Sequence, residues 1–311
     1  MKELIFLTPS FHYRIWGGVR LKEFYPNLNK ENIGEAWAIS AHENGPSTVL
    51  NGRFKGATLD ELYKNQRDLF GNIKNEKFPL LIKIIDANDK LSVQVHPDDF
   101  LAKKYNSYGK TECWYILDAK ENSSIIYGHN ALTKEEFITK VNLGKFDDLL
   151  YKVPVQKGDF FFIPAGIVHA LGEGIMLLEI QQSSDITYRL YDYDRIDKDG
   201  KKRELHLQAG IEATKIPSPI IKNQISSQQI NSNLISNLID FKYFSVYKWD
   251  LKYSFITSNK PFTLLTILSG SGIINGHKYQ KGDSCLVPNY FSKINITPKI
   301  PSEIIAVTLP D

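Results

Sequence analysis

The stretch that decides the fold reads G158-D-F-F-F-I-P-A-G-I-V-H169. Its aromatic and β-branched run, 160–163, predicts a β-strand. Pro164 and Gly166 then predict a tight turn, after which the chain returns as a second strand. His169 projects from that returning strand, so the stretch predicts a strand, a turn and an imidazole at a defined place in a β-structure.

The same stretch has a faint internal repeat. V155-Q-K-G-D159 and the proline that follows align without gaps with Y279-Q-K-G-D283 and its proline, at a constant offset of 124 residues. Such self-similarity predicts two related structural units. Lys293 stands where the first unit has His169, and a protonated lysine cannot ligate a cation. We therefore expect two related β-barrels, of which only the first keeps metal-binding residues and the second is structural.

The rest of the chain also predicts a mainly β protein with a few short helical insertions. Short apolar runs between Gly, Pro, Asn and Asp predict further strands at 80–86, 91–96, 113–117, 124–127 and 176–181. Capping boxes that begin at Thr58 and Thr133 predict two helices. Two shorter helices are expected at 98–105 and 145–150.

Composition divides the chain into three parts. Residues 215–237 are rich in Ile, Ser, Asn, Gln and Pro and have little periodicity, which is typical of a linker or crossing segment. We expect a metal-containing catalytic domain at 1–214 and a metal-free barrel at 238–311.

Four residues have the side chains and spacing of metal ligands. Gln94 and His96 are two apart, so both project from the same face of a strand. Glu112 and His169 come from two other segments, and Lys110 shares the face of Glu112. Two imidazoles, a carboxylate and an amide oxygen suit zinc or a similar first-row ion. The alternatives are hydrogen-bonded core histidines, an amide that serves the backbone, and a Glu112–Lys110 ion pair.

Bulk properties exclude several classes of protein. The 311 residues carry a net charge of only +3 and have no run of Lys or Arg, so no nucleic-acid partner is expected. Two cysteines are too few for a disulfide framework. The apolar stretch near the start is too short for a signal peptide, and no segment could span a bilayer. We expect a soluble, cytoplasmic protein without a membrane partner.

The spacing G-x5-P-x-G-x2-H is one of two signature patterns of the cupin (double-stranded β-helix) barrels, and longer motifs narrow the resemblance. Over nearly its whole length the chain resembles the type I mannose-6-phosphate isomerases (phosphomannose isomerases) in their short bacterial form. The motifs that carry this resemblance are Y13-R-I-W-G-G18, G34-E-A-W-A-I-S40, F78-P-L-L-I-K-I-I-D86, L91-S-V-Q-V-H-P-D98, G109-K-T-E-C-W-Y115, P164-A-G-I-V-H-A170 and S183-S-D-I-T-Y-R189.

The resemblance implies one zinc ion per chain. It makes His96, Glu112 and His169 the zinc ligands and Gln94 a further ligand. The implied reaction interconverts mannose 6-phosphate and fructose 6-phosphate by proton transfer between C1 and C2 through a cis-enediol. The large helical domain of the longer family members has no counterpart here.

The resemblance also implies catalytic roles for three further residues. Arg189 matches the family's active-site arginine, Lys110 matches an active-site lysine, and Glu179 matches an acidic residue considered for proton transfer. Either Glu179 or Lys110 could be the base, and Lys110 could instead bind the phosphate. Arg189 could instead form a salt bridge with Asp192 or Asp194.

Two other functions remain open at this point. One is another metal-dependent cupin enzyme, such as an iron oxygenase, although such sites usually have His-x-His at the position of Gln94 and His96. The other is a non-enzymatic bicupin that binds a sugar or a metal, which would not need so many ionisable groups around one metal.

Overall fold

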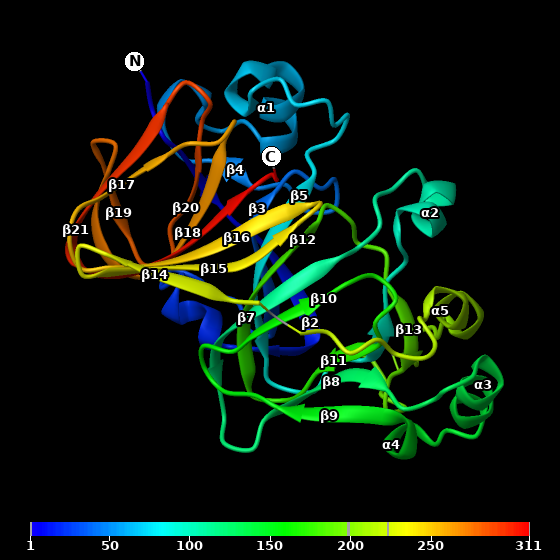
Figure 1. Cartoon of the computed structure of the whole chain (residues 1–311). Helices are drawn as coiled ribbons and strands as arrows, with labels where there is room; N and C mark the ends of the chain where they lie inside the picture. Colours follow the sequence, from blue (N-terminus) through cyan, green and yellow to red (C-terminus); the bar gives the residue numbers. More distant parts are fainter. Residues whose placement is uncertain (1, 198–199, 223, 311) are drawn as a thin grey trace.

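The computed structural model describes residues 2–197, 200–222 and 224–310, and it is mainly β with few helices, as the sequence predicts (Figure 1). Within these residues the strands form a ten-stranded, a six-stranded and a five-stranded sheet. The six-stranded sheet lies in the middle, because its residues contribute to the hydrophobic clusters that it shares with each of the other two.

The middle sheet and the five-stranded sheet together position the site. The six-stranded order is β10 (Phe160–Ile163), β7 (Glu112–Ala119), β12 (Ile175–Gln182), β5 (Leu80–Ala87), β2 (Ser10–Gly18) and β3 (Ile33–Ser40). The five-stranded order is β13 (Tyr188–Tyr191), β6 (Val93–Val95), β11 (His169–Leu171), β8 (Ser124–His129) and β9 (Leu150–Pro154). The runs predicted as strands are thus all found as strands.

The ten-stranded sheet combines the two ends of the chain. Its main path is β14 (Ser226–Ile230), β15 (Asn233–Phe241), β16 (Phe244–Leu251), β21 (Lys293–Thr308), β18 (Thr263–Ile274), β20 (Ser284–Val287), β1 (Ile5–Thr8) and β4 (Thr48–Val49), with β17 (Phe255–Ser258) on β21 and β19 (His277–Gln280) on β18. The expected linker therefore contains β14 and the beginning of β15, and the N-terminal β1 pairs with β20. The division into two barrel domains stays a prediction.

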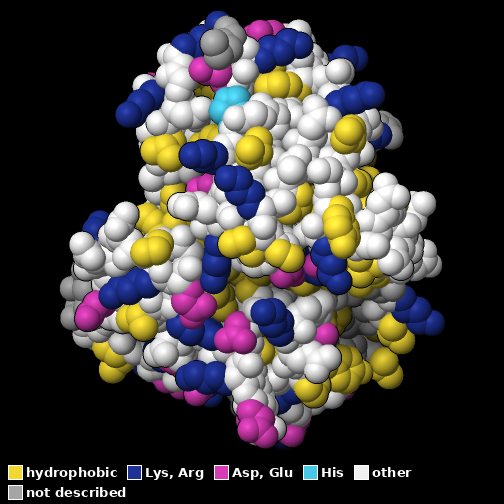
Figure 2. Space-filling view, turned by 90° about the vertical axis from the view of Figure 1, so that its left-hand side faces the viewer, with side chains coloured by type: hydrophobic (Ala, Val, Ile, Leu, Met, Phe, Trp, Pro, Cys, Tyr) yellow, Lys and Arg dark blue, Asp and Glu magenta, His cyan; other side chains and the backbone are white. Residues whose placement is uncertain are grey.

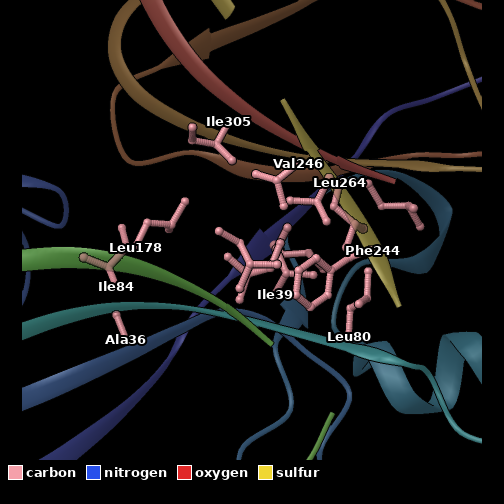
Figure 3. Packing of buried hydrophobic residues seen from close by; sticks show 14 of the residues in the cluster. Ala36, Ile39, Leu80, Ile84, Leu178, Phe244, Val246, Leu264 and Ile305 are labelled. Atoms are coloured by element: carbon pink, nitrogen blue, oxygen red, sulfur yellow. The ribbon is translucent and has the colours of Figure 1, made fainter. Parts of the chain in front are cut away.

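Strand β5 shows how the middle sheet is buried on both faces. All eight of its residues are buried, and successive side chains point to opposite faces. Leu80, Ile82 and Ile84 pack toward the ten-stranded sheet, against residues such as Phe244 (Figure 3). Lys83, between them in sequence, points to the other face, where it lines a pocket. A charged side chain in this position needs a partner.

The sequence repeat is also a repeat of local structure. Strands β10 and β20 begin at Phe160 and Ser284, which are 124 positions apart. Gly158 and Gly282 precede them with φ of 92° and 90°, a conformation that glycine adopts without strain. In both turns the side chain of the aspartate that follows accepts a hydrogen bond from the backbone N–H of the glutamine three positions earlier. The repeated Q-K-G-D segment therefore forms the same turn twice, by the same contacts.

The helices lie at the edges of the sheets. They are α1 (Leu59–Asn65), α2 (Asp99–Ala102), α3 (Lys134–Asn142), α4 (Phe146–Leu149) and α5 (Leu207–Ala213), with 3-10 turns at Arg20–Glu23, Gly52–Phe54, Arg67–Phe70 and Lys103–Tyr105. The Thr58 capping box is present, and the Thr133 side chain caps α3. Helix α5 was not predicted, because His206 at its start makes no capping hydrogen bond and its first turn has no acidic residue.

None of the described helices combines the length and the apolarity that crossing a bilayer requires. On the face drawn in Figure 2, Lys and Arg side chains are spread over the whole surface, Asp and Glu lie among them mainly in the lower half, and hydrophobic side chains form small separate groups.

Phe244 offers a test of the packing between the middle and ten-stranded sheets. Its ring is fully buried, so Phe244→Ala should lower the free energy of unfolding by about 3–5 kcal/mol, through lost burial and a residual cavity. Urea denaturation followed by fluorescence would measure this. Ile256→Ala is the matched control, because Ile256 is 63% exposed. Equal losses in the two variants would contradict the assigned core.

Candidate active site

Three predicted ligands meet between the middle and five-stranded sheets. The ligand atoms of His96, Glu112 and His169 lie within 4.8 Å of one another, and all three side chains are buried. Glu112 is the first residue of β7 and His169 the first of β11, while His96 directly follows β6. The cluster therefore forms where three strands begin or end, which leaves room for a ligand beside it.

Both imidazoles are oriented by backbone carbonyls. Nδ1 of His96 lies 2.9 Å from the Ile186 carbonyl oxygen, and Nδ1 of His169 lies 2.9 Å from that of Ile167. A carbonyl oxygen can only accept, so each Nδ1 carries the proton and each Nε2 presents a lone pair. Burial lowers the pKa of His96 well below its usual value and that of His169 to about 4. Both rings are therefore neutral at pH 7, as metal ligands must be.

Glu112 completes a set of converging acceptors. It is fully buried, with Oε1 3.3 Å from His169 Nε2 and Oε2 3.4 Å from His96 Nε2. Neither oxygen has a hydrogen-bond partner of good geometry in the described part of the chain. Burial, and then the nearby Glu179 carboxylate, raise the pKa of Glu112 to about 7. A buried carboxylate facing two lone pairs without such donors fits a bound cation.

Gln94 and Lys110 adjoin the cluster. The Gln94 amide nitrogen is 3.3 Å from His169 Nε2, and rotating the amide by 180° presents its oxygen there instead. Lys110 Nζ is 2.9 Å from His96 Nε2 and 3.1 Å from Glu112 Oε2. The Glu112–Lys110 ion pair considered from the sequence is thus formed. The Lys110 ammonium group partly offsets the negative charge of the Glu112 carboxylate.

Gln94 and Lys110, which adjoin the cluster, line a pocket of about 380 Å³. Five basic side chains line this pocket together with three acidic ones: Arg14, Lys83, Lys110, Arg189 and Arg203, with Glu35, Glu179 and Asp185. This cationic excess suits an anionic ligand such as a phosphate ester. A larger cavity of about 530 Å³, between Lys90 and Tyr193, is lined by neither Gln94 nor Lys110.

Glu179 lies in the pocket as an ion-paired carboxylate. Its Oε1 is 3.1 Å from Lys83 Nζ, and its Oε2 accepts a 3.0 Å hydrogen bond from Trp114 Nε1. Burial alone would raise the pKa of Glu179, but Lys83 and then Lys110 lower it below its usual value. Glu179 is therefore ionised at pH 7 and can accept a proton.

Arg14, Glu35 and Lys83 were not predicted as site residues. Arg14 binds Glu35 with two hydrogen bonds of 2.9 Å, and Trp37 Nε1 donates to the same carboxylate at 2.7 Å. Burial would raise the pKa of Glu35, but Lys83 and Arg14 lower it to about 2. The sequence does contain a signal for buried charges here, which is the lysine inside F78-P-L-L-I-K-I-I85. A charged side chain in an otherwise apolar strand must have a buried partner.

Arg189 has no carboxylate within ion-pair distance among the described residues. Asp192 is bound instead by Arg195 and Arg203, and Asp194 by Lys202. Arg189 Nη1 donates to the Glu204 carbonyl oxygen at 2.8 Å. The salt bridges considered from the sequence are therefore not formed, and the guanidinium keeps its charge at the pocket wall.

The structure thus brings all seven sequence-predicted site residues to one place. They are Gln94, His96, Lys110, Glu112, His169, Glu179 and Arg189. Their individual roles stay predictions.

Comparisons with known proteins find similar sequences over most of the chain. A family model described as the catalytic domain of type I phosphomannose isomerase matches residues 4–126, and one described as the cupin domain of mannose-6-phosphate isomerase matches residues 235–308. The chain is 48% identical to mannose-6-phosphate isomerase ManA of Bacillus subtilis, over 92% of this chain and 93% of that protein. It is 47% identical to the mannose-6-phosphate isomerase of Streptococcus mutans, over 93% of each.

Solved structures are similar over the same length. The crystal structure of the Bacillus subtilis mannose 6-phosphate isomerase superposes with a TM-score of 0.95 at 40% identity, covering 98% of this chain and 99% of that one. The apo mannose 6-phosphate isomerase of Salmonella typhimurium superposes with a TM-score of 0.78 at 16% identity, covering 100% of both chains, and thus shares the fold.

The Glu35 carboxylate predicts a pH dependence of stability. Its folded pKa of about 2 lies below the ordinary value of 4.5, so its contribution is complete above pH 4.5 and is lost as pH falls toward 2. For the metal-free protein, Glu35→Gln should therefore lower the free energy of unfolding by roughly 3 kcal/mol at pH 6. The difference from the unsubstituted protein should shrink as pH falls below 4.5.

Urea unfolding at several pH values measures this difference. Glu31→Gln, at an exposed glutamate, is the matched control and should show almost no difference at any pH. A Glu35→Gln difference that stays constant from pH 6 to pH 3 would rule out the buried ionised pair.

Proposed function

The chain belongs to the type I phosphomannose isomerases, enzymes of the mannose-6-phosphate isomerase class, and on that premise we propose how its site works. It interconverts mannose 6-phosphate and fructose 6-phosphate with a zinc ion held by His96, Glu112 and His169. The observation that carries this proposal is the buried cluster of two oriented imidazoles and one carboxylate that lacks well-aligned donors.

The donor set supports zinc at this site. Two imidazole nitrogens and one carboxylate oxygen are the protein ligands of many catalytic zinc sites, which keep a further position open. Both imidazoles donate their Nδ1 protons to carbonyl oxygens, which fixes the ring orientation and makes Nε2 a better ligand. We propose the side-chain amide oxygen of Gln94 as the fourth protein ligand of the zinc ion.

The reaction moves one proton between C1 and C2 of the open-chain sugar and a second between the oxygens on these carbons, through an enediolate with negative charge on oxygen. When bound, the metal ion supplies Lewis-acid polarisation of the sugar carbonyl, which acidifies the neighbouring C–H bond. The remaining requirements are a proton carrier and a cation near the developing charge, and side chains of this pocket supply both.

Two groups in the pocket can carry the proton. Glu179 is held ionised by Lys83, so it can accept the proton from one carbon and return it to the other. Lys110 lies 3.1 Å from Glu112, and as an ammonium group it can donate to a sugar oxygen. We assign the transfer between carbons to Glu179 and the oxygen contact to Lys110.

Arg189 is our candidate for electrostatic stabilisation. Without a carboxylate partner among the described residues, its charge is available to the substrate. A cation already in place beside the developing charge lowers the barrier, because it needs no reorganisation during the reaction.

Metal removal provides the direct test of this function. The protein should form fructose 6-phosphate from mannose 6-phosphate in a coupled assay, lose this activity on chelation, and regain it when zinc is added without oxygen. Recovery without oxygen would exclude an oxygenase. No turnover by zinc-loaded protein would refute the isomerase proposal and favour a non-enzymatic binding protein.

Two substitutions separate metal binding from catalysis. His96→Ala should lose both zinc and turnover, whereas Arg189→Ala should keep one zinc per chain and lower kcat about 10²–10³-fold. Metal analysis and steady-state kinetics measure both effects, and Arg189→Lys should recover part of the rate. Stoichiometric zinc in His96→Ala would show that the ligand assignment is wrong, and unchanged kcat in Arg189→Ala would return this residue to a structural role.

A further inference from the structure

The loop that carries Lys110 is packed directly on the beginning of α2. Lys110 donates its backbone N–H to the Pro97 carbonyl oxygen at 3.0 Å. A Cβ added to Gly109 would lie 2.6 Å from the backbone of both Asp98 and Asp99, so no larger residue fits. The loop and the start of α2 are therefore in close contact, and the position of one depends on the other.

Asp99 and Gln182 hold the backbone on both sides of Lys110. Asp99 Oδ1 accepts hydrogen bonds from Gly109 N at 2.8 Å and from Gln182 Nε2 at 2.9 Å. Gln182 Oε1 in turn accepts from Thr111 N at 3.0 Å. Hydrogen bonds to an ionised carboxylate are stronger than neutral ones, so the Asp99 carboxylate is the principal anchor of this loop.

The other carboxylate oxygen of Asp99 is bound by a residue of the ten-stranded sheet's β15–β16 turn. Asp99 Oδ2 accepts a hydrogen bond from the Tyr243 hydroxyl, and Tyr243 lies in the turn between β15 and β16. Neighbouring rings position this turn: Phe241 packs on Phe162 with ring centroids 4.7 Å apart, and Phe244 is fully buried. The hydroxyl is therefore presented to Asp99 by the core between the two sheets.

We propose that Tyr243 is a positioning residue, through which the ten-stranded sheet holds the loop that carries Lys110 and leads into Glu112. The chain of contacts runs from Tyr243 to Asp99, and from there to Gly109 directly and to Thr111 through Gln182. For its catalytic consequence the inference rests on the proposed function, whereas its structural consequence can be measured in metal-free, inactive protein.

The Tyr243–Asp99 hydrogen bond supports the loop from outside, and we call it the brace. Asp99 is exposed, whereas Gly109, Lys110, Thr111 and Gln182 are buried. A cavity of about 350 Å³, lined by Tyr243 and Asp99 among others, lies beside it. Water can therefore replace the lost hydroxyl, so removing it should loosen the loop without unfolding the protein.

Tyr243→Phe tests the brace with a change of one hydroxyl. In hydrogen exchange of the metal-free protein, the segment 106–112 should exchange about fivefold faster than in the unsubstituted chain. In the zinc-loaded enzyme kcat should fall about three- to tenfold with KM changed less than twofold, because a misplaced catalytic group affects the chemical step more than binding. Asp99→Ala should give larger changes in the same direction.

Tyr115→Phe is the matched control. The Tyr115 hydroxyl donates to Glu303 Oε1 at 2.7 Å, so it also connects the middle and ten-stranded sheets, but it does not contact the loop. Exchange of 106–112 should stay unchanged in this variant. Equal acceleration in both variants would mean general loosening between the sheets, and unchanged exchange in Tyr243→Phe would mean that the loop needs no brace. Either result overturns the proposal.

A double substitution shows whether the kinetic effect acts through Lys110. In a Lys110→Met background, Tyr243→Phe should leave the residual kcat almost unchanged, because the group that it positions is gone. A loss as large as in the unsubstituted background would overturn the assigned route. If the zinc-loaded protein does not turn over mannose 6-phosphate at all, the proposed function fails, while hydrogen exchange still decides the inference about Tyr243.

Discussion

Burial of the middle sheet on both faces is the constraint on which the rest of the structure depends. One face of β5 packs into the apolar core against the ten-stranded sheet, and the other face carries Lys83 into the pocket. A lone ammonium group there would be very costly. Glu179, directly opposite in the neighbouring strand, and Glu35 both lower that cost by raising the pKa of Lys83 against the effect of burial. The ionised state of Glu179 is thus a consequence of how the sheet is buried.

The metal cluster follows from the same layering. Glu112 comes from the middle sheet, whereas the two histidines lie at the ends of β6 and β11, two inner strands of the five-stranded sheet. Three converging acceptors repel one another, and Lys110, which contacts His96 and Glu112, offsets this only in part, so the core around them must hold them in place. The cluster therefore consists of three metal-ligand atoms that a rigid β framework directs to one point, an arrangement that suits a catalytic metal site.

The repeated turn occurs twice with the same local structure, but the strands that follow carry different side chains. Both place a positive-φ glycine and an aspartate before a buried strand. In the first copy His169 begins the returning strand and belongs to the cluster. In the second copy Lys293 begins β21 and is exposed. Lys293 takes the place of His169 in the ten-stranded sheet, yet through Tyr243 this sheet contacts Asp99, whose carboxylate binds the loop that carries Lys110.

Local chemistry determined what the sequence could reveal by itself. The strands, the capped helices, the repeated Q-K-G-D segment and the spacing of the proposed ligands all depend on neighbours within a few residues. The catalytic roles of Lys110, Glu179 and Arg189 were instead implied by the family resemblance. Only the tertiary structure decided the pairing of β1 with β20, the Arg14–Glu35–Lys83–Glu179 row of charges and the Tyr243–Asp99 contact. The partners in these contacts are distant in sequence, and strand order and the packing of layers, which no local pattern encodes, bring them together.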